Sequence, residues 1–133
     1  MPSAVVDASA LVDLFIGSPA ADAIFARLFR TESVLHAPHS IDVEVAHAVR
    51  KLWRRGLLVD QDVDRIADTY SQIAIVRHGA APFLHRIWRL RYNHSPYDAA
   101  YVALAEWLDL PLVTRDRRLA RSSGHGATIE YVA

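Results

Sequence analysis

Residues 4–14, Ala-Val-Val-Asp-Ala-Ser-Ala-Leu-Val-Asp-Leu, join a short apolar run to the start of a helical segment. The apolar run, residues 4–6, is rich in β-branched side chains and predicts a buried strand that ends at Asp7. Ser9 is predicted to open a short helix, which the Gly-Ser-Pro sequence at 17–19 ends. A buried strand that leads at once into a helix is typical of a parallel sheet flanked by helices.

The same alternation continues to the end of the chain. Further short strands are predicted at residues 34–37, 75–77, 112–114 and 128–132. Further helices are predicted at residues 19–30, 40–55, 60–72 (from Asp60 or Asp62), 82–92, 95–108 and 116–122, and Ser40 is expected to cap the long helix. The pattern predicts an α/β fold: a single domain over residues 1–133, with a short, mainly parallel sheet of about five strands flanked by α-helices.

Composition narrows the classes of function. The chain has 133 residues, of which 52% are hydrophobic and 23% charged, so we expect one folded domain. A formal net charge of +0 argues against a protein that coats nucleic acid, although a nuclease needs only a local basic rim. The absence of cysteine excludes disulfides, thiolate zinc sites and cysteine nucleophiles.

The apolar N-terminal segment does not resemble a targeting or membrane sequence. It has no basic region before the apolar residues, and Asp7 and Asp13 interrupt it. No other apolar run approaches the length of about 18 residues that a membrane span needs. We therefore expect a cytoplasmic protein with no membrane partner.

Four acidic residues are the candidates for chemistry: Asp7, Glu44, Asp98 and Asp116. Three of them lie at the beginnings of predicted helices, and two of these follow strands, so the fold would bring them to the carboxyl edge of the sheet. Carboxylates that converge repel one another unless a positive group lies among them, and a hard divalent cation is the usual partner. The arrangement indicates metal-dependent chemistry.

Each acid also has a structural explanation. Asp7 and Asp116 are favoured N-cap residues for the helices that follow them. Glu44 lies at the edge of an apolar helix stripe, where a surface base such as Arg50 is an alternative partner.

Asp98 is the most informative of the four. It shares a helix face with Tyr101 and Leu108, and a carboxylate at the head of an apolar stripe is costly unless it is paired or bound to metal. The alternative is a capping box with Ser95, in which Asp replaces the usual Glu.

Four segments together resemble a known family: residues 5–14, 41–50, 95–106 and 112–120. They are similar to the PIN-domain ribonucleases and, more narrowly, to the VapC-type toxins of bacterial toxin–antitoxin pairs. The likeness covers essentially the whole chain in order, and residues 97–105 are its most specific part.

The resemblance implies that the four acids converge on Mg²⁺ or Mn²⁺ and hydrolyse RNA phosphodiester bonds, leaving a 5′-phosphate and a 3′-hydroxyl. Ser9 and Thr114 match hydroxyl positions that support the acidic cluster. The implied partners are a cognate VapB-like antitoxin and a second copy of the chain, giving a heterotetramer or larger complex with the antitoxin.

Four arginines surround Asp116 and are candidates for RNA binding: Arg115, Arg117, Arg118 and Arg121. Arginine suits bidentate contacts with phosphate, although a solvated helix face explains the run equally well.

Two other hypotheses remain beside the nuclease. A catalytically silent PIN-like scaffold that binds RNA or protein is the alternative function, and the presence of all four acids argues against it. The apolar residues Trp53 and 57–59 either cover the core or form a patch for an antitoxin or a second subunit. A phosphatase with paired aspartates is excluded, because Ser9 stands where the second aspartate is needed.

Overall fold

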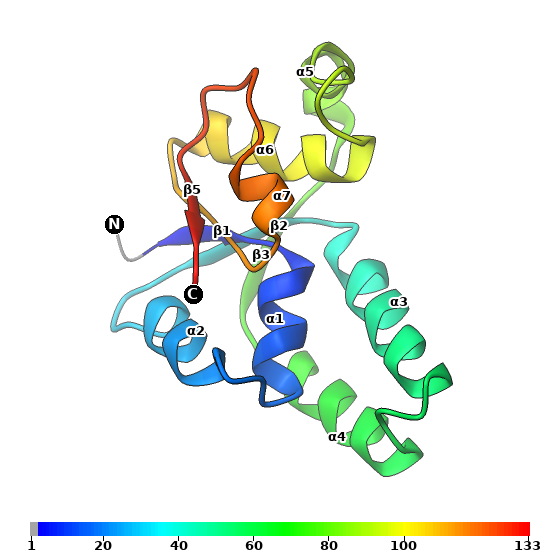
Figure 1. Ribbon diagram of the computed structural model, residues 1–133. Coiled ribbons are helices and arrows are strands. Elements are labelled where there is room, and N and C mark those ends of the chain that lie inside the picture. Colours follow the sequence, from blue (N-terminus) through cyan, green and yellow to red (C-terminus); the bar gives the residue numbers. More distant parts are fainter. Residues whose placement is uncertain (1–2) are drawn as a thin grey trace.

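A five-stranded parallel sheet lies at the centre of the protein (Figure 1). The computed structural model describes residues 3–133, so Met1 and Pro2 of the predicted domain and N-terminal segment lie outside the described residues. The spatial order of the strands is β3-β2-β1-β4-β5, and every neighbouring pair is parallel. The strands are β1 (Ala4–Val6), β2 (Leu35–Pro38), β3 (Ile75–His78), β4 (Leu112–Thr114) and β5 (Ile129–Tyr131). The predicted parallel α/β sheet is confirmed.

Helices cover both faces of this sheet. Helices α1 to α4 lie on one side, and α5 and α6 lie on the other (Figure 1). Their bounds are α1 (Ala8–Phe15), α2 (Ala21–Leu28), α3 (Ile41–Arg54), α4 (Asp60–Ser71), α5 (Leu84–Arg89), α6 (Pro96–Leu108) and α7 (Arg117–Ala120), with a 3₁₀ turn η1 (Ala81–Phe83) before α5. No helix within residues 3–133 is long and apolar enough to cross a membrane.

The core lies against the central strand, β1. All three residues of β1 are fully buried, as expected for a strand covered on both faces. Residues 99–105 of α6 are buried without interruption, and four of the seven are alanine. Small side chains let this helix lie close to the sheet. Tyr101 is its largest fully buried residue.

The structure differs from the sequence predictions at two helices, the one after Ser40 and the one predicted at residues 82–92. Ser40 occupies the predicted N-cap position of α3, but it has helical backbone angles and its side chain makes no capping hydrogen bond. The predicted helix 82–92 is interrupted, because a 3₁₀ turn precedes α5 and the N–H groups of Arg91 and Asn93 bond to carbonyls three residues back. These tight turns end α5 early and direct the chain into Ser95.

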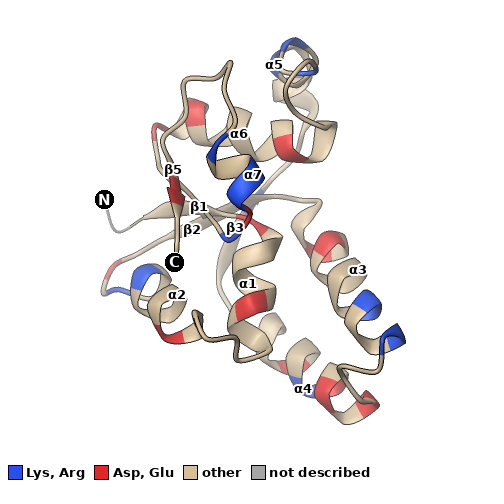
Figure 2. Ribbon diagram, in the orientation of Figure 1, with Lys and Arg blue, Asp and Glu red and all other residues tan. Residues whose placement is uncertain are grey.

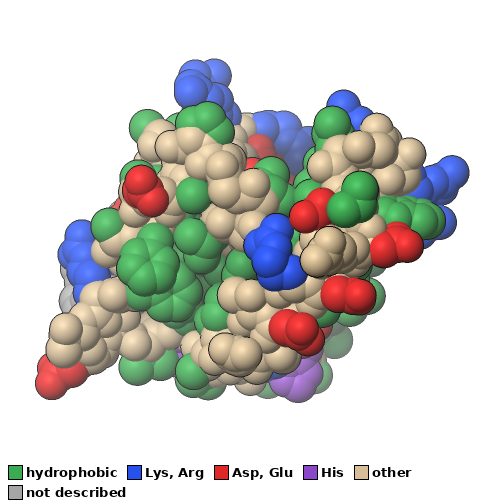
Figure 3. Space-filling model, turned by 90° about the horizontal axis from the view of Figure 1, so that it is seen from below, with side chains coloured by type: hydrophobic (Ala, Val, Ile, Leu, Met, Phe, Trp, Pro, Cys, Tyr) green, Lys and Arg blue, Asp and Glu red, His purple; other side chains and the backbone are tan. Residues whose placement is uncertain are grey.

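The lower surface keeps apolar side chains exposed (Figure 3). Phe25 is 58% exposed and lies in a groove formed by α1, α2 and α4. A second groove, between α3 and α4, includes Trp53. Leu58 packs against the core, as one of the two expectations for this segment had it, whereas Leu57 and Val59 are exposed.

Replacement of Leu11 by alanine should lower the free energy of unfolding by about 2–5 kcal/mol, because Leu11 is fully buried between α1 and the sheet. Urea denaturation followed by circular dichroism measures this loss. Leu57→Ala is the matched control, since Leu57 is 62% exposed and should change stability little. Equal losses in both variants would contradict the assignment of the core.

Candidate active site at the carboxyl edge of the sheet

The pairing of two neighbouring strands creates the centre of the site. Strands β1 and β4 are paired in parallel with Val6 opposite Val113, so the residues that follow them, Asp7 and Thr114, lie side by side. Asp116 lies two residues beyond Thr114, at the start of α7. Acidic residues also mark the beginnings of α3 and α6 around the same edge (Figure 2).

Asp7 is a buried carboxylate with hydrogen-bond donors at both of its oxygens. It is 5% exposed. Its Oδ1 accepts hydrogen bonds from Ser9 Oγ at 2.7 Å and from the Ala10 N–H at 3.1 Å, and its Oδ2 accepts one from Thr114 Oγ1. Burial raises the pKa of Asp7 to about 6, although the hydrogen bonds from Thr114 and Ser9 act in the opposite direction. Asp7 also caps α1, as the structural explanation predicted.

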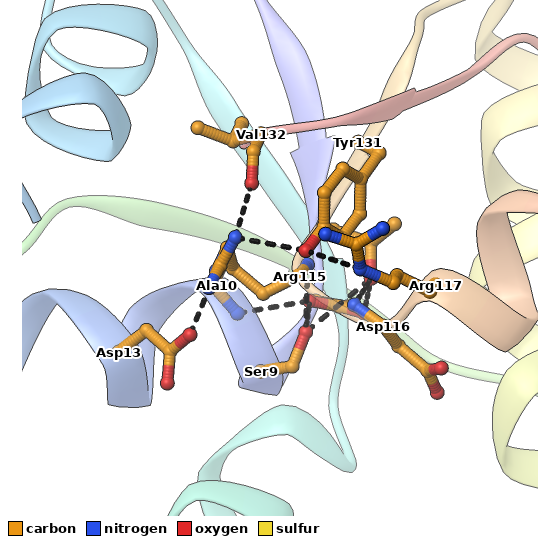
Figure 4. Close-up of polar contacts among 10 residues, drawn as sticks. Ser9, Ala10, Asp13, Arg115, Asp116, Arg117, Tyr131 and Val132 are labelled. Atoms are coloured by element: carbon orange, nitrogen blue, oxygen red, sulfur yellow. Dashed lines mark hydrogen bonds and ion pairs between the residues drawn. The ribbon is translucent and has the colours of Figure 1, made fainter. Parts of the chain in front are cut away.

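The backbone of the β4–α7 loop orients both hydroxyl donors, of which Figure 4 labels Ser9. The Arg115 N–H donates to Ser9 Oγ at 3.0 Å, and the Asp116 N–H donates to Thr114 Oγ1 at 2.9 Å. Because each hydroxyl oxygen already accepts a hydrogen bond from the backbone, its own proton is free to point at Asp7. The two predicted supporting residues therefore hold both oxygens of one carboxylate.

Glu44 is held at one oxygen only. Its Oε2 accepts hydrogen bonds from Ser40 Oγ and from the Tyr101 hydroxyl, both at 2.9 Å. The described residues provide no hydrogen bond to Oε1. Partial burial and then the charge of Asp98 raise the pKa of Glu44. The alternative of a surface ion pair with Arg50 is not what the structure contains, since Ser40 and Tyr101 are the partners.

Asp98 and Asp116 complete the set. Partial burial is the main cause that raises the pKa of Asp98, and the charge of Asp116 is the second. Arg118 and His94 act in the opposite direction. Arg118 Nη2 lies 3.6 Å from Asp98 Oδ2. The Asp98 N–H donates to Ser95 Oγ at 3.2 Å, which is one half of the expected capping box.

Asp116 acts as the N-cap of α7. Its Oδ1 accepts the N–H groups of Arg118 at 2.9 Å and Leu119 at 3.3 Å. This capping role was the structural explanation for the residue, and it occupies one carboxylate oxygen.

The charge of one acid raises the pKa of another, and these pairwise effects together involve all four acids. The charge of Asp116 raises the pKa values of Asp7 and Asp98, and the charge of Asp98 raises that of Glu44. Within residues 3–133, no three acidic or histidine side chains are close enough together to hold an ion as they stand. The only ion pair made by any of the four within the described chain is the one between Asp98 and Arg118.

The chemistry of these side chains suits a divalent cation, and they would have to draw closer together to bind one. Three of the four carboxylates lack an ion-pair partner in the described chain, and burial is the main cause of the raised pKa values of Asp7, Glu44 and Asp98. Carboxylate oxygens are the preferred ligands of Mg²⁺ and Mn²⁺, and such an ion would favour the charged form of each acid.

The four arginines near Asp116 divide into two groups. The Arg115 guanidinium binds Asp13 at 2.8 Å, the Val132 carbonyl at 2.6 Å and the Tyr131 hydroxyl at 3.0 Å (Figure 4). It therefore connects α1 to the C-terminal strand.

The other three, Arg117, Arg118 and Arg121, line a shallow pocket with Asn93, Ser122 and Ser123. Arg118 has a side chain 84% exposed, and Arg117 stacks on the Tyr131 ring with 4.8 Å between guanidinium carbon and ring centroid. Of this group, Arg118 presents its positive charge beside Asp98.

Sequence reasoning missed the two donors to Glu44. The sequence pattern places Tyr101 in an apolar stripe and Ser40 at a helix cap, and it indicates no contact of either with Glu44. A buried tyrosine normally finds a hydrogen-bond partner for its hydroxyl, which was the available signal. The identity of that partner, 57 residues away, depends on how α6 and α3 meet.

Comparison with known proteins identifies the family to which the chain belongs. The sequence pattern of the PIN domain matches residues 4–124. "Ribonuclease VapC12" of Mycobacterium tuberculosis (strain ATCC 25618 / H37Rv) is 45% identical over 129 residues, covering 97% of this chain and 98% of that protein. "Ribonuclease VapC1" of the same strain is 38% identical over 133 residues, covering 99% of each. A solved structure, "Crystal structure of PAE2754 from Pyrobaculum aerophilum", superposes with a TM-score of 0.66 and 27% identity, covering 96% of this chain and 82% of that chain.

The chain therefore belongs to the PIN-domain family. More narrowly, it is a VapC-type member of that family, since two VapC ribonucleases match it over almost its whole length.

Without divalent metal, Asp7→Asn should alter how stability depends on pH. A carboxyl whose pKa is raised to about 6 favours folding below pH 4, and this contribution is lost as pH rises through 6. The loss in the wild type is roughly 3 kcal/mol at most. Thermal unfolding in EDTA at pH 4, 5, 6 and 7 measures it, and the asparagine variant should lose less stability over this range. Parallel curves for the two proteins would show that Asp7 titrates as an ordinary carboxyl.

Proposed function

We propose that this protein is a metal-dependent endoribonuclease toxin of a VapBC-like toxin–antitoxin system, which hydrolyses RNA phosphodiester bonds. The observation that carries the proposal is the buried Asp7, held at both oxygens, beside three further acids at the carboxyl edge of the sheet. The membership of the chain among VapC-type PIN proteins supports RNA as the substrate.

The acids are proposed to hold Mg²⁺ or Mn²⁺, with Asp7 and Asp98 as primary ligands and Asp116 and Glu44 completing the shell directly or through waters. When bound, such an ion lowers the pKa of a bound water and neutralises charge on the phosphate. Ser9 and Thr114 orient Asp7, as their hydrogen bonds to both oxygens require. Glu44 or Asp116 accepts the proton from the attacking water.

Glu44 is suited to this task because one of its oxygens is anchored. Tyr101 and Ser40 both donate to Oε2, which fixes the plane of the carboxylate and leaves Oε1 for a water or a metal ligand position. We infer that Tyr101 is a positioning residue for Glu44.

The proposed partners are a cognate VapB-like antitoxin and a second copy of the chain, assembled as a heterotetramer or larger complex in the cytoplasm. The apolar grooves between α3 and α4 and among α1, α2 and α4 support a protein partner, since exposed apolar surface of this kind favours association. Arg117, Arg118 and Arg121 are proposed to contact RNA phosphates, whereas Arg115 acts through its contact with Asp13.

Purified protein freed of any partner should cleave total cellular RNA into discrete fragments with Mg²⁺ or Mn²⁺ but not with EDTA. Asp7→Asn and Asp98→Asn should each lower cleavage by at least about 100-fold, or about 3 kcal/mol in the barrier. Asp64→Asn is the matched control, because Asp64 is an exposed acid on α4. Discrete fragments resolved on a denaturing gel measure the effect.

Two results would count against this function. Full activity in a folded Asp98→Asn variant would remove that residue from the mechanism. Failure of the wild type to bind Mn²⁺ at all would favour the alternative of a catalytically silent scaffold.

Tyr101→Phe should reduce kcat by roughly 10-fold, because one charge-assisted hydrogen bond to Glu44 is lost while the buried ring remains. The KM for RNA and the melting temperature should change little, and the affinity for Mn²⁺ without RNA should fall.

The matched control is Tyr70→Phe. Tyr70 also donates its hydroxyl to a carboxylate of α3, at 2.6 Å from Asp42 Oδ1, but Asp42 is outside the acidic site. Equal effects of the two substitutions on kcat and Mn²⁺ binding would mean that Tyr101 acts only through general stability.

A further inference from the structure

An exposed aromatic and basic surface lies next to the arginine pocket. It consists of Trp88 in α5 and Arg91 and Tyr92 directly after it, and we call it the α5 platform. Trp88 is 66% exposed and Tyr92 is 81% exposed. Single exposed aromatics are common on protein surfaces, but these two rings are arranged around one cation.

Arg91 holds both rings. Its guanidinium carbon lies 4.5 Å from the Trp88 ring centroid and 4.4 Å from that of Tyr92. Its Nη1 donates to the Trp88 carbonyl and its Nη2 to the Tyr92 hydroxyl, both at 2.8 Å. The rings are therefore positioned in advance, with much of their surface open to solvent.

The charge around the platform is positive. Residues 84–94 include Arg86, Arg89 and Arg91 and contain no acidic residue, although the chain as a whole has a net charge of +0. Arg86 is neutralised by Glu106 at 2.7 Å. Neither Arg89 nor Arg91 forms an ion pair with any carboxylate of the described chain.

The chain runs from the platform directly into residues that line the acidic site. Asn93, the residue after Tyr92, lines the shallow pocket with Arg117, Arg118 and Arg121. The adjoining pocket contains Asn93, His94 and Asp98 together with Arg118. Helix α5 stands beyond the beginning of α6, where Asp98 lies (Figure 1).

Open aromatic rings among unpaired cations match the chemistry of single-stranded RNA. Unstacked bases bind aromatic and guanidinium planes, and the backbone follows positive charge. A protein partner would favour an apolar surface with fewer charges at its centre. We propose that the α5 platform is a binding subsite for unpaired bases of the RNA, next to the cleaved phosphate.

This proposal rests on the RNA-directed function, and it is tested by binding rather than by cleavage. Labelled single-stranded oligouridine is titrated with the full-length protein in EDTA, and fluorescence anisotropy gives the Kd. The double variant Trp88→Ala, Tyr92→Ala should bind at least roughly 10-fold more weakly. An abasic ribose-phosphate oligomer of the same length should bind equally well to the variant and the wild type, because it has no bases to stack.

Two variants separate stacking from other effects. Trp53→Ala removes a tryptophan that is 46% exposed in the groove between α3 and α4, on the other side of the sheet from α5 (Figure 1), and should leave oligouridine binding unchanged. Arg89→Gln should weaken binding of both oligomers and reduce the salt dependence of Kd, as loss of a phosphate contact requires.

Unchanged oligouridine binding by the double variant would overturn the proposal. So would an equal loss for the abasic oligomer, or a loss of self-association in sedimentation with RNA binding intact, which would identify a protein interface. Cleavage is measured separately with Mg²⁺. If the wild type binds oligouridine through the platform but does not cleave RNA, the nuclease proposal is refuted and the subsite proposal is retained. If the wild type cleaves RNA and the double variant binds oligouridine equally well, the subsite proposal is refuted and the nuclease proposal is retained.

Discussion

The parallel pairing of β1 with β4 is the constraint on which the rest of the site depends. It places the carboxylate of Asp7 against the hydroxyl of Thr114 at the edge of the sheet, where both are buried. A buried charge is costly unless donors surround it, and Ser9, Thr114 and the Ala10 N–H supply them. The N–H groups of residues 115 and 116 fix the direction of the two hydroxyls, so the loop after β4 is part of the same network.

The capping roles of the acids and their proposed chemical roles do not exclude each other. Asp7 caps α1 and Asp116 caps α7, and in each case the helix N–H groups bind Oδ1. A helix N-terminus stabilises a carboxylate in its charged form and holds it in place. The structural explanation for these residues is therefore also an explanation of how the carboxylates are presented at the edge of the sheet. Glu44 is anchored in a different way, by two hydroxyls on one oxygen.

Positive charge is divided between internal support and open surface. Arg115 is used to connect Asp13, Tyr131 and the Val132 carbonyl, and Arg86 is neutralised by Glu106. Arg118 of α7 lies beside Asp98 at the beginning of α6, and Arg89 and Arg91 have no ion-pair partner in the described chain. The chain therefore has a basic region beside the acids although its net charge is near zero. Negative residues elsewhere, notably on α4, balance this positive charge. Local distribution of charge, rather than its sum, governs encounter with a charged polymer.

The sequence by itself determined the order of strands and helices along the chain, the parallel α/β class and the two N-caps at Asp7 and Asp116. These depend on local patterns of apolar, β-branched and capping residues, which act over a few positions. It also identified Ser9 and Thr114, through resemblance of the surrounding segments to a family. Only the tertiary structure decided that Ser40 and Tyr101 hold Glu44, that Arg115 faces inward and that Arg91 arranges two exposed rings beside the site. Side-chain contacts between distant elements depend on how helices pack against the sheet, and a one-dimensional pattern does not contain that geometry.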